Sequence, residues 1–585
     1  MGKAGFSRKF RGIFLLAAAL FASVAAWGKV IYVDTDAPRA NDGTSWENAY
    51  FYLQDGLMFA VADDEIRVAQ GVYKPDDFVL SDRPSRGREE TFQLINGVTL
   101  KGGYAGFGEV DPNVRDVKLY ETVLSGDLDG NDVDVNDPYD LLTELTRGEN
   151  SCNVVTATDC NITAIIDGFT ITAGNANGSI LAGGGIYGGG PKVGHCKIIA
   201  NSASGVGGGI FGGASLQDSI VSYNAAGEGG GIYYCEEIGT EIISCTINGN
   251  STVGGSGGGI LFSGACGATI TDCVISSNSA NASGGAIWSG YECGFVFTRC
   301  TFTSNSSKGG GGAVSNNACT CQSYITFNQC RFIGNQSISD GGGLFSSGYL
   351  GTQLRNCLFI GNRTRGNGGA IYDAPDAGTS LVNCTIADNI VSGKGGGICY
   401  ESGSCGYAYR GLINSIVLGN SDSDGQMRLD SQIYLKDADM IPINYCCIPY
   451  RGGKGNIFCR PFFAKRGYWD PNGTPQDAND DFWVDGDYHL KSQAGRWEPN
   501  EGRWMTDDVT SPCIDAGDPM APIMHEPFPN GGVINMGAYG GTAEASKSYF
   551  GGPVCETIVA GDVNGDCLID FKDFFFVALH WMESH

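Results

Sequence analysis

The central part of the chain repeats one pattern of apolar and polar positions. The pattern is Cys-x-(Ile/Phe/Val)-x-x-Asn, with serine in place of cysteine in two repeats. Its asparagines step by 23, 26, 28, 27, 30, 27, 27 and 31 residues: Asn201, Asn224, Asn250, Asn278, Asn305, Asn335, Asn362, Asn389 and Asn420. A second pattern, Gly-Gly-(Gly/Ala)-(Ile/Val/Leu), alternates with it and contributes Ile186, Ile210, Ile232, Ile260, Ile287, Val314, Leu344, Ile371 and Ile398. Self-similarity at such a period indicates a solenoid or a propeller.

The spacing inside each repeat distinguishes these architectures. Apolar residues alternate at period two, as at Cys300 and Phe302, which is the spacing of a strand. No helical stretch separates the strands, and a propeller blade needs about 40 residues. The pattern therefore predicts an all-β chain, a right-handed parallel β-helix with three short strands and three bends per coil. For the coil of residues 284–310, strands are expected at Gly285–Trp288, Phe295–Thr298 and Cys300–Thr303.

Each repeated residue has an expected role in these coils. The isoleucines of the second pattern should stack inside the solenoid, and Phe302, Phe332 and Phe359 should stack on one another. The asparagines should end a strand and bond through their amides to the coils above and below, which forms a ladder. A solvated bend is expected at the residue before each cysteine or serine: His195, Asp218, Ser244, Asp272, Arg299, Gln329, Asn356, Asn383 and Asn414.

The chain has 22 cysteines, a number that normally suggests disulfides in an exported protein. Seven occupy the repeat position: Cys196, Cys245, Cys273, Cys300, Cys330, Cys357 and Cys384. Stacked Cβ atoms about 4.8 Å apart are farther apart than the ~3.8 Å that a disulfide prefers. We interpret these seven mainly as small buried apolar residues, with a chain of disulfides as the alternative. Five loop cysteines could pair between adjacent coils: Cys266, Cys293, Cys319, Cys321 and Cys405.

Charge and composition restrict the class of partner. The chain has 37 basic and 64 acidic residues, a net charge of −27, which argues against nucleic acid and against anionic membrane surfaces. Glycine accounts for 91 of 585 residues and charged residues for only 17%, which favours a turn-rich β protein. The hydrophobic fraction of 42% is too high for a disordered chain.

The N-terminus has the features of an export signal. Basic residues between Lys3 and Arg11 precede an apolar stretch from about Gly12 to Trp27 that ends in small residues. This arrangement predicts a cleaved signal peptide over residues 1–27, and an uncleaved membrane anchor is the alternative. No later stretch is long and apolar enough to span a bilayer. We therefore expect a secreted, extracellular or cell-surface protein.

The repeat resembles a known type. Phe302-Thr-Ser-Asn305, Phe332-Ile-Gly-Asn335 and Phe359-Ile-Gly-Asn362, alternating with Gly-Gly-Ala-Ile and its variants, resemble the repeats of chlamydial-type polymorphic outer-membrane proteins. They are also similar to a wider class of secreted bacterial β-helix proteins with the pectate-lyase-like fold. The resemblance covers roughly residues 160 to 425. It implies the fold strongly and an activity weakly, and the outer-membrane members imply adhesion.

The flanking segments resemble the same class. The stretches 30–104 and Ser511–Asp518, the latter with Met536–Tyr539, are similar to the opening and closing parts of such a solenoid, whose ends must be capped. The expected organisation has five parts. They are a signal peptide (1–27), an N-terminal cap with the first coils (28–150), repeated coils (151–425), C-terminal coils with a cap (426–550) and a dockerin-like tail (556–585).

The tail carries the spacing of a calcium loop. Oxygen-bearing side chains stand at loop positions 1, 3, 5, 9 and 12, and position 7 would contribute a backbone carbonyl: Asp562, Asn564, Asp566, Asp570, Asp573 and, at position 7, Leu568. An amphipathic helix is expected from Phe574 to Met582. The loop resembles one half of a dockerin, but Cys567 stands at position 6, where glycine makes the turn, and there is only one loop. These departures argue against binding a cohesin in the usual way, and Ca²⁺ is the expected cofactor.

Two functions from different classes remain open. The first is an extracellular binding, adhesion or structural rod directed at polysaccharide or a cell-surface protein. The second is a polysaccharide lyase or glycoside hydrolase, which needs clustered carboxylates, or Ca²⁺ with a basic residue, on adjacent coils. Asp272 beside Arg299 is the best such pair, and a surface ion pair explains it more simply. No enzyme signature is recognised. Two acidic segments, Asp127–Asp132 and Asp470–Asp477, are interpreted as solvated turns rather than cation sites.

Overall fold

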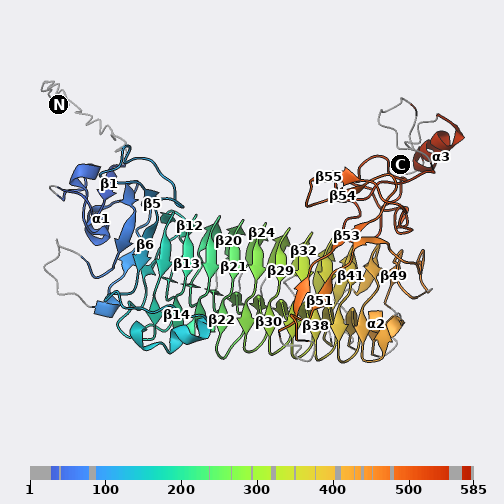
Figure 1. Ribbon diagram of the computed structural model, residues 1–585, viewed down its shortest axis with the longest axis horizontal. Helices are drawn as coiled ribbons and strands as arrows, with labels where there is room; N and C mark the ends of the chain where they lie inside the picture. Colours follow the sequence, from blue (N-terminus) through green and yellow to red (C-terminus); the bar gives the residue numbers. More distant parts are fainter. Residues whose placement is uncertain are drawn as a thin grey trace, which may run out of the picture.

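The computed structural model describes residues 28–38, 41–77, 87–235, 238–264, 267–290, 294–317, 325–347, 351–375, 377–401, 410–426, 428–436, 441–450, 452–474, 480–551, 561 and 569–581. Figure 1 shows one long solenoid with added segments at both ends. Consecutive coils pair in parallel in four long sheets within the described part of the chain. The parallel β-helix predicted from the repeat is confirmed. The expected signal peptide and the five loop cysteines lie outside the described residues.

We name the four sheets A to D. Sheet A contains β1 (Val30–Val33), β2 (Glu65–Ala69), β5 (Thr99–Tyr104), β8 (Ile165–Asp167), β12 (Lys192–Gly194), β16 (Ser215–Gln217), β20 (Ile238–Ile243), β24 (Gly267–Thr271), β28 (Gly294–Thr298), β32 (Ile325–Asn328), β36 (Thr352–Arg355), β40 (Thr379–Val382), β44 (Gly411–Ile413) and β49 (Ile443–Asn444). Sheet B contains β3 (Gly71–Tyr73), β6 (Thr122–Ser125), β9 (Thr170–Thr172), β13 (Lys197–Ile199), β17 (Ile220–Ser222), β21 (Thr246–Asn248), β25 (Val274–Ser276), β29 (Thr301–Thr303), β33 (Arg331–Ile333), β37 (Leu358–Ile360), β41 (Thr385–Ala387) and β45 (Ile416–Val417).

Sheet C contains β4 (Phe92–Gln93), β7 (Val155–Thr156), β11 (Ile186–Tyr187), β15 (Ile210–Phe211), β19 (Ile232–Cys235), β23 (Ile260–Ser263), β27 (Ile287–Ser289), β31 (Val314–Asn316), β35 (Leu344–Ser346), β39 (Ile371–Asp373), β43 (Ile398–Tyr400) and β48 (Ile433–Leu435). Sheet D contains β10 (Asn175–Ala176), β14 (Ser202–Val206), β18 (Ala225–Glu228), β22 (Ser251–Thr252), β26 (Ser279–Ala280), β30 (Ser306–Ser307), β34 (Gln336–Ser337), β38 (Arg363–Thr364), β42 (Ile390–Val391), β46 (Ser421–Asp422) and β47 (Gly425–Gln426).

The remaining elements are short. Three antiparallel pairs follow the last coil: β50 (Phe463–Lys465) with β53 (Asp487–Leu490), β51 (Tyr468–Asp470) with β52 (Phe482–Val484), and β54 (Arg496–Glu498) with β55 (Arg503–Met505). The helices are α1 (Leu53–Phe59), α2 (Leu429–Gln432) and α3 (Phe571–Trp581), with 3₁₀ turns at Trp46–Asn48, Gly87–Glu89, Pro138–Leu142 and Leu145–Arg147. Among the described residues, no helix combines the length and the apolar character needed to cross a membrane.

The prediction of three strands per coil is wrong, because a fourth strand follows each asparagine. In the coil of residues 284–310 the chain runs through β27, β28, β29 and then the two-residue strand β30. The first strand also starts later than expected, at Ile287 instead of Gly285. Strands of two residues are too short to show an alternation of apolar and polar positions, so the sequence pattern could not reveal sheet D.

Two left-handed residues per coil make the bends on either side of sheet B. The residue before each repeat cysteine or serine has a φ angle between 48° and 55°, as at Arg299 and Gln329. The residue before each asparagine is also left-handed, with φ of 55° at Ser304 and 59° at Gly334. Residues other than glycine rarely adopt this backbone conformation. It persists here because the residue on either side is fixed by the next coil.

The solenoid interior consists of columns of like residues. Ile260, Ile287 and Val314 lie in register on consecutive strands of sheet C and are almost fully buried. The rings of Phe302 and Phe332 stack with centroids 4.7 Å apart, and the next pair in the column is 4.2 Å apart. One hydrophobic cluster extends from the first coils to the last. The predicted stacking of isoleucine and phenylalanine is confirmed.

The predicted asparagine ladder is also confirmed. The side-chain oxygen of Asn335 accepts hydrogen bonds from the backbone N–H and the Nδ2 of Asn305, both at 3.0 Å. The side-chain oxygen of Asn362 accepts in the same way from the backbone N–H of Asn335 at 3.1 Å and from its Nδ2 at 2.9 Å. The ladder runs from Asn201 to Asn420 and ends on Gln432, whose Oε1 accepts from Asn420 at 3.0 and 2.9 Å. A glutamine in α2 thus replaces the missing next coil.

The seven repeat cysteines are buried in a column at the start of sheet B, as expected for small apolar residues. Five of the thiols donate to backbone carbonyls of the preceding coil, as Cys300 does to Ile270 at 3.4 Å, and those of Cys245 and Cys330 donate to a carbonyl two residues earlier in the chain. Where serine replaces cysteine, its hydroxyl accepts from the N–H of the preceding coil, as Ser415 does from Cys384 at 3.0 Å. Cysteine and serine are therefore interchangeable small residues at this bend.

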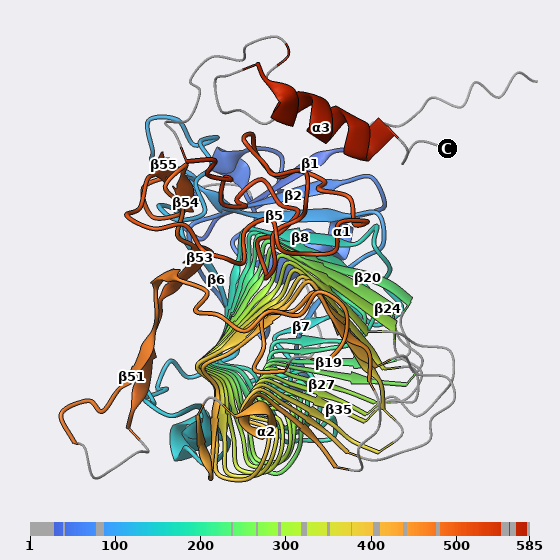
Figure 2. The same ribbon diagram turned by 90° about the vertical axis from the view of Figure 1, so that its right-hand side faces the viewer.

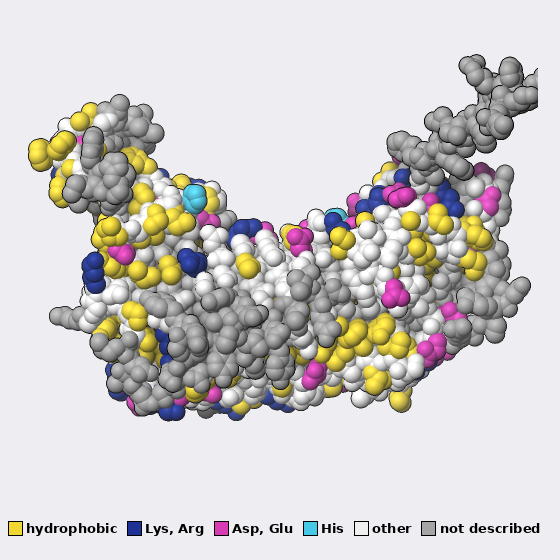
Figure 3. All heavy atoms as spheres, turned by 180° about the vertical axis from the view of Figure 1, so that it is seen from behind, with side chains coloured by type: hydrophobic (Ala, Val, Ile, Leu, Met, Phe, Trp, Pro, Cys, Tyr) yellow, Lys and Arg dark blue, Asp and Glu magenta, His cyan; other side chains and the backbone are white. Residues whose placement is uncertain are grey.

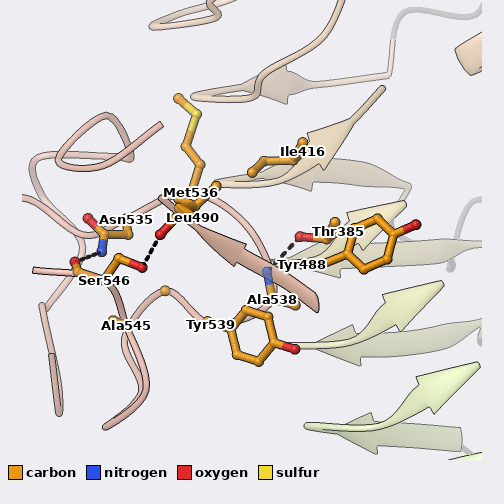
Figure 4. Close-up of a pocket in the computed structure, with 11 residues that line it drawn as sticks. Thr385, Ile416, Tyr488, Leu490, Asn535, Met536, Ala538, Tyr539, Ala545 and Ser546 are labelled. Carbon is orange, nitrogen blue, oxygen red and sulfur yellow. Dashed lines mark hydrogen bonds between the residues drawn. The ribbon is translucent and has the colours of Figure 1, made fainter. Parts of the chain in front are cut away.

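The C-terminal segments lie against the side of the solenoid. Figure 2 shows β51 and β53 beside sheet B, and Figure 4 shows the contact region, where Ala538 donates to Thr385 Oγ1 at 2.9 Å. Asn383 and Asn414 are almost fully buried there, because Asn383 donates to Asn535 and Asn414 accepts from Asp518. The expectation of a solvated bend is wrong for these two residues. The cavity in Figure 4 encloses about 10 Å³, room for one water molecule.

We predict that Asn305→Ala lowers the free energy of unfolding by about 2–5 kcal/mol, because it removes the side-chain oxygen that the buried N–H of Asn278 donates to and the side-chain donor to the carbonyl of Ile275. Urea unfolding followed by circular dichroism measures the change. The control is Asn328→Ala, since Asn328 is partly exposed at the end of β32. Equal stability of the two variants would contradict the ladder's role.

A second prediction concerns Glu526, which is buried within residues 511–548, here called the closing segment, and accepts from the N–H groups of Asn535 and Gly541, both at 2.8 Å. Burial raises the pKa of Glu526 to about 7. The folded state therefore holds a proton that the unfolded chain releases above pH ~4.5, so stability falls as pH rises through 7. Relative to Glu526→Gln, which keeps the accepting oxygen, the wild type should lose on the order of 3 kcal/mol between pH 4.5 and 8.

Thermal unfolding at several pH values measures this difference. Glu109→Gln, at an exposed position, should leave the pH dependence of the wild type unchanged. Parallel curves for the wild type and Glu526→Gln would show that Glu526 does not titrate in this range.

Candidate functional site

The long edge above sheet A is concave. Figures 1 and 2 show that the N-terminal coils and the C-terminal segments both rise above this sheet, and Figure 3 shows the hollow between them with basic and acidic side chains along its floor. The left-handed residues at the bend between sheets A and B form a row along the same edge, because each coil places its bend over the previous one. This bend row links two pockets.

The N-terminal pocket encloses about 490 Å³ and contains an ionisable cluster. Nδ1 of His195 lies 2.8 Å from a carboxylate oxygen of Asp167, and its Nε2 lies 3.8 Å from Asp218, on the next coil. Beside it, Lys197 donates to Glu121 at 2.8 Å, and this hydrogen bond lowers the pKa of Glu121. An imidazole between two carboxylates can accept a proton from a bound molecule and pass it on.

The C-terminal pocket encloses about 290 Å³ between the bend row and the closing segment, and its lining includes Arg299, Arg331 and Glu544. Arg299 donates to both carboxylate oxygens of Asp272, at 2.6 and 2.7 Å, and these bonds lower the pKa of Asp272. The pair proposed from the sequence therefore forms, on adjacent coils and exposed to solvent. Both oxygens of Asp272 are engaged by Arg299, which leaves the carboxylate poorly placed to act as a base.

A groove crosses sheet D and encloses about 420 Å³. Its outward residues stand one and three positions after the ladder asparagines. They include the basic residues Lys308, Arg363 and Arg365, together with serines, a glutamine and two exposed isoleucines, Ile338 and Ile390. Arg363 is paired with Asp481 at 3.0 Å and lies 4.1 Å from the ring centroid of Trp469, in the β51–β52 hairpin. The side chains of Lys308 and Arg365 are exposed and have no ion-pair partner among the residues that the structure describes.

Sequence reasoning missed this groove. Lys308 and Arg365 both stand three positions after a ladder asparagine, two coils apart, which corresponds to about 10 Å along the solenoid axis. That register was visible in the repeat. It could not be interpreted without knowing that a fourth strand follows each asparagine and points these side chains outward.

One acidic segment forms a cluster. Asp127, Asp132 and Glu149 each place a carboxylate oxygen within 4.8 Å of the others. Asp127 accepts from the N–H groups of Gly130 and Asn131, which is the turn predicted from the sequence. Burial raises the pKa values of Asp132 and Glu149. Of the other segment, Asp470 accepts from the backbone N–H of Asn472 at 3.0 Å, again in a turn.

The expected calcium loop is only partly described. Asp562, Asn564, Asp566 and Leu568 lie outside the described residues. Asp570 accepts from the N–H of Lys572 at 2.7 Å, and its own N–H donates to Asp573 at 2.8 Å, so these two residues form a reciprocal cap at the start of α3. The helix begins at Phe571, three residues before the expected start. The last two of the expected ligand positions are thus fixed relative to the helix.

Comparison with known proteins agrees with the repeat. Residues 272–290, 299–317 and 356–374 match the Chlamydia polymorphic membrane protein repeat, and each segment spans parts of successive coils. Residues 472–517 match a family described as disaggregatase related. No curated protein sequence matches the chain. The chain is therefore a parallel β-helix, and three of its segments match repeats of the polymorphic membrane protein type.

Two solved structures show a distant likeness. The crystal structure of pectate lyase Pel9A aligns over 87% of this chain and 96% of its own length, with 12% identity and a TM-score of 0.35. A rhamnogalacturonan lyase aligns over 77% of this chain and 94% of its own, with 11% identity and a TM-score of 0.18.

Proposed function

We propose that this protein is an exported polysaccharide-binding rod that holds an anionic polymer in the groove on sheet D. The observation that carries the proposal is the pair Lys308 and Arg365, two exposed cations without an ion-pair partner among the described residues, in one groove of a chain whose net charge is −27. In such a chain, surplus carboxylates are abundant. A basic groove therefore indicates a site that accepts carboxylates from elsewhere.

The shape of the groove fits a linear polymer. Its lining comes from five successive coils, from Ser279 to Ser392, so an extended chain lying parallel to the solenoid axis meets similar positions at each coil. Hydroxyl and amide groups beside the cations, such as Ser306 and Gln336, can bond sugar hydroxyls, while Arg365 can bind a carboxylate with two parallel hydrogen bonds.

Export and a surface location belong to the same proposal. The basic and apolar segment at the start of the sequence supports export, and the polymorphic membrane protein repeats support a place at the cell surface. We also propose that the tail binds one Ca²⁺ through Asp562, Asn564, Asp566, Asp570 and Asp573, with the carbonyl of Leu568. The cap formed by Asp570 and Asp573 supports this, since it places both residues where the loop enters α3.

A lyase or hydrolase on the same fold is the alternative, and the N-terminal pocket is the observation that favours it. His195 next to Asp167 could remove a proton from a sugar bound over the bend row, and Lys197 could offset the charge of a nearby carboxylate. A lyase or hydrolase function requires that a bond in the polymer is broken. A binding protein leaves the polymer intact.

We predict that Lys308→Ala/Arg365→Ala weakens binding of polygalacturonate about tenfold or more, because two charge-assisted contacts are lost. Affinity is measured by isothermal titration calorimetry at low and high salt, with dextran as the neutral polymer. The control is Lys192→Ala/Arg355→Ala, which removes the same two charges from exposed positions on sheet A.

Equal affinity of both double variants would exclude the groove as the binding site. The same incubations, with and without Ca²⁺, are assayed for new reducing ends and for unsaturated products. Formation of either product would replace the binding function by the enzymatic one.

For the tail, Asp562→Ala/Asp566→Ala should remove one Ca²⁺ per chain, because two of the five side-chain ligands are lost. Calorimetric titration of the full chain counts the ions. Glu556→Gln, an acidic residue just before the loop, is the control, and Asp127→Ala separates any ion held by the acidic cluster. An unchanged ion count in the double variant would refute the loop assignment.

A further inference from the structure

Three thiols meet where the closing segment reaches the last coil. Sγ of Cys459 lies 3.5 Å from Sγ of Cys447 and 3.8 Å from Sγ of Cys513, and all three sulfurs lie within 4.8 Å of one another. They come from three separate stretches of the chain: the end of the solenoid, the loop that follows it and the closing segment. We call these residues the thiol cluster.

The backbone holds each member of the thiol cluster in place. The N–H of Cys447 donates to Ser415 on the previous coil at 2.9 Å, and Cys447 also forms a bridge with Ile457, two residues before Cys459. The carbonyl of Cys513 accepts from the N–H of Met536 at 3.0 Å. The three sulfurs therefore converge through the fold itself and not through a flexible loop.

The surroundings of the thiol cluster are apolar. Cys447 and Cys513 are fully buried in a small hydrophobic cluster that contains Ile416 and Met536, while Cys459 is half-buried at its edge. Solvent therefore reaches the thiol cluster on the side of Cys459.

The separation of the sulfurs matches a metal site better than a disulfide. A tetrahedral zinc ion with Zn–S bonds of about 2.3 Å places its sulfur ligands about 3.8 Å apart. A disulfide brings two sulfurs to ~2.05 Å and leaves the third without a partner. Three sulfurs at 3.5 and 3.8 Å can all serve one soft cation at once.

We propose that Cys447, Cys459 and Cys513 bind one soft divalent cation of the Zn²⁺ class as three thiolates. Each thiol releases its proton as its sulfur binds the ion. Among the described residues no fourth histidine, cysteine or carboxylate joins the group. The fourth position therefore opens beside Cys459 toward solvent, where water or an added ligand completes the tetrahedron. The ion ties the closing segment to the last coil.

The test uses the full chain, purified without oxygen, stripped with a chelator and titrated with Zn²⁺ or Co²⁺ alone. The wild type should bind one equivalent of Co²⁺ with sulfur-to-cobalt charge-transfer absorption. Cys459→Ser should abolish that absorption and weaken Zn²⁺ binding at least tenfold. Cys446→Ser is the control, because Cys446 is the adjacent residue but packs into the main core.

The absorption band is a property of thiolate ligands, so carboxylate sites elsewhere do not produce it. Circular dichroism checks that Cys459→Ser is folded, and the half-buried position of Cys459 favours this. Absence of the band in the wild type, or its persistence in Cys459→Ser, would overturn the proposal. A disulfide between any two of the three cysteines in the protein as isolated, found by peptide mapping without reductant, would overturn it as well.

Discussion

The structure depends on one constraint: each coil must place the same residue at the same point as the coil before it. The asparagine ladder enforces this register, because each buried side-chain amide accepts from the preceding coil and donates both to that coil and to the next, as Asn305 does. A slip by one residue would bury an amide without partners and turn the apolar columns outward. The ladder and the apolar columns therefore enforce the same register. Gln432 ends the ladder, because its side chain takes the place of the next asparagine.

This constraint explains which parts of the fold the sequence predicted. Columns such as Asn305 to Asn335 and Phe302 to Phe332 must repeat in sequence because they repeat in space, so the period, the interior and the ladder were all predictable. Sheet D was not, since strands of two residues carry no periodic signal of their own. In the structure, the left-handed residue before each asparagine turns the chain out of sheet B and into sheet D.

The candidate sites follow the opposite rule. Outward positions are free to differ from coil to coil. The repeat fixes where Lys308 and Arg365 stand but does not require basic residues there. The thiol cluster was even harder to predict from the sequence. Cys459 and Cys513 are 54 residues apart and meet only because the closing segment folds back along the solenoid, and no local pattern encodes that return.

The bend row shows how one structural position takes several roles along the rod. Near the N-terminus it carries His195 in a charged pocket, in the middle it carries the Asp272–Arg299 ion pair, and near the C-terminus it carries asparagines such as Asn414, which hold the closing segment. The backbone conformation is the same at each place, with φ close to 50°. The fold requires only this backbone conformation, so the side chain at each bend can differ. The closing segment packs on the part of the row that carries asparagines, because an uncharged amide can be buried at lower cost than a charge.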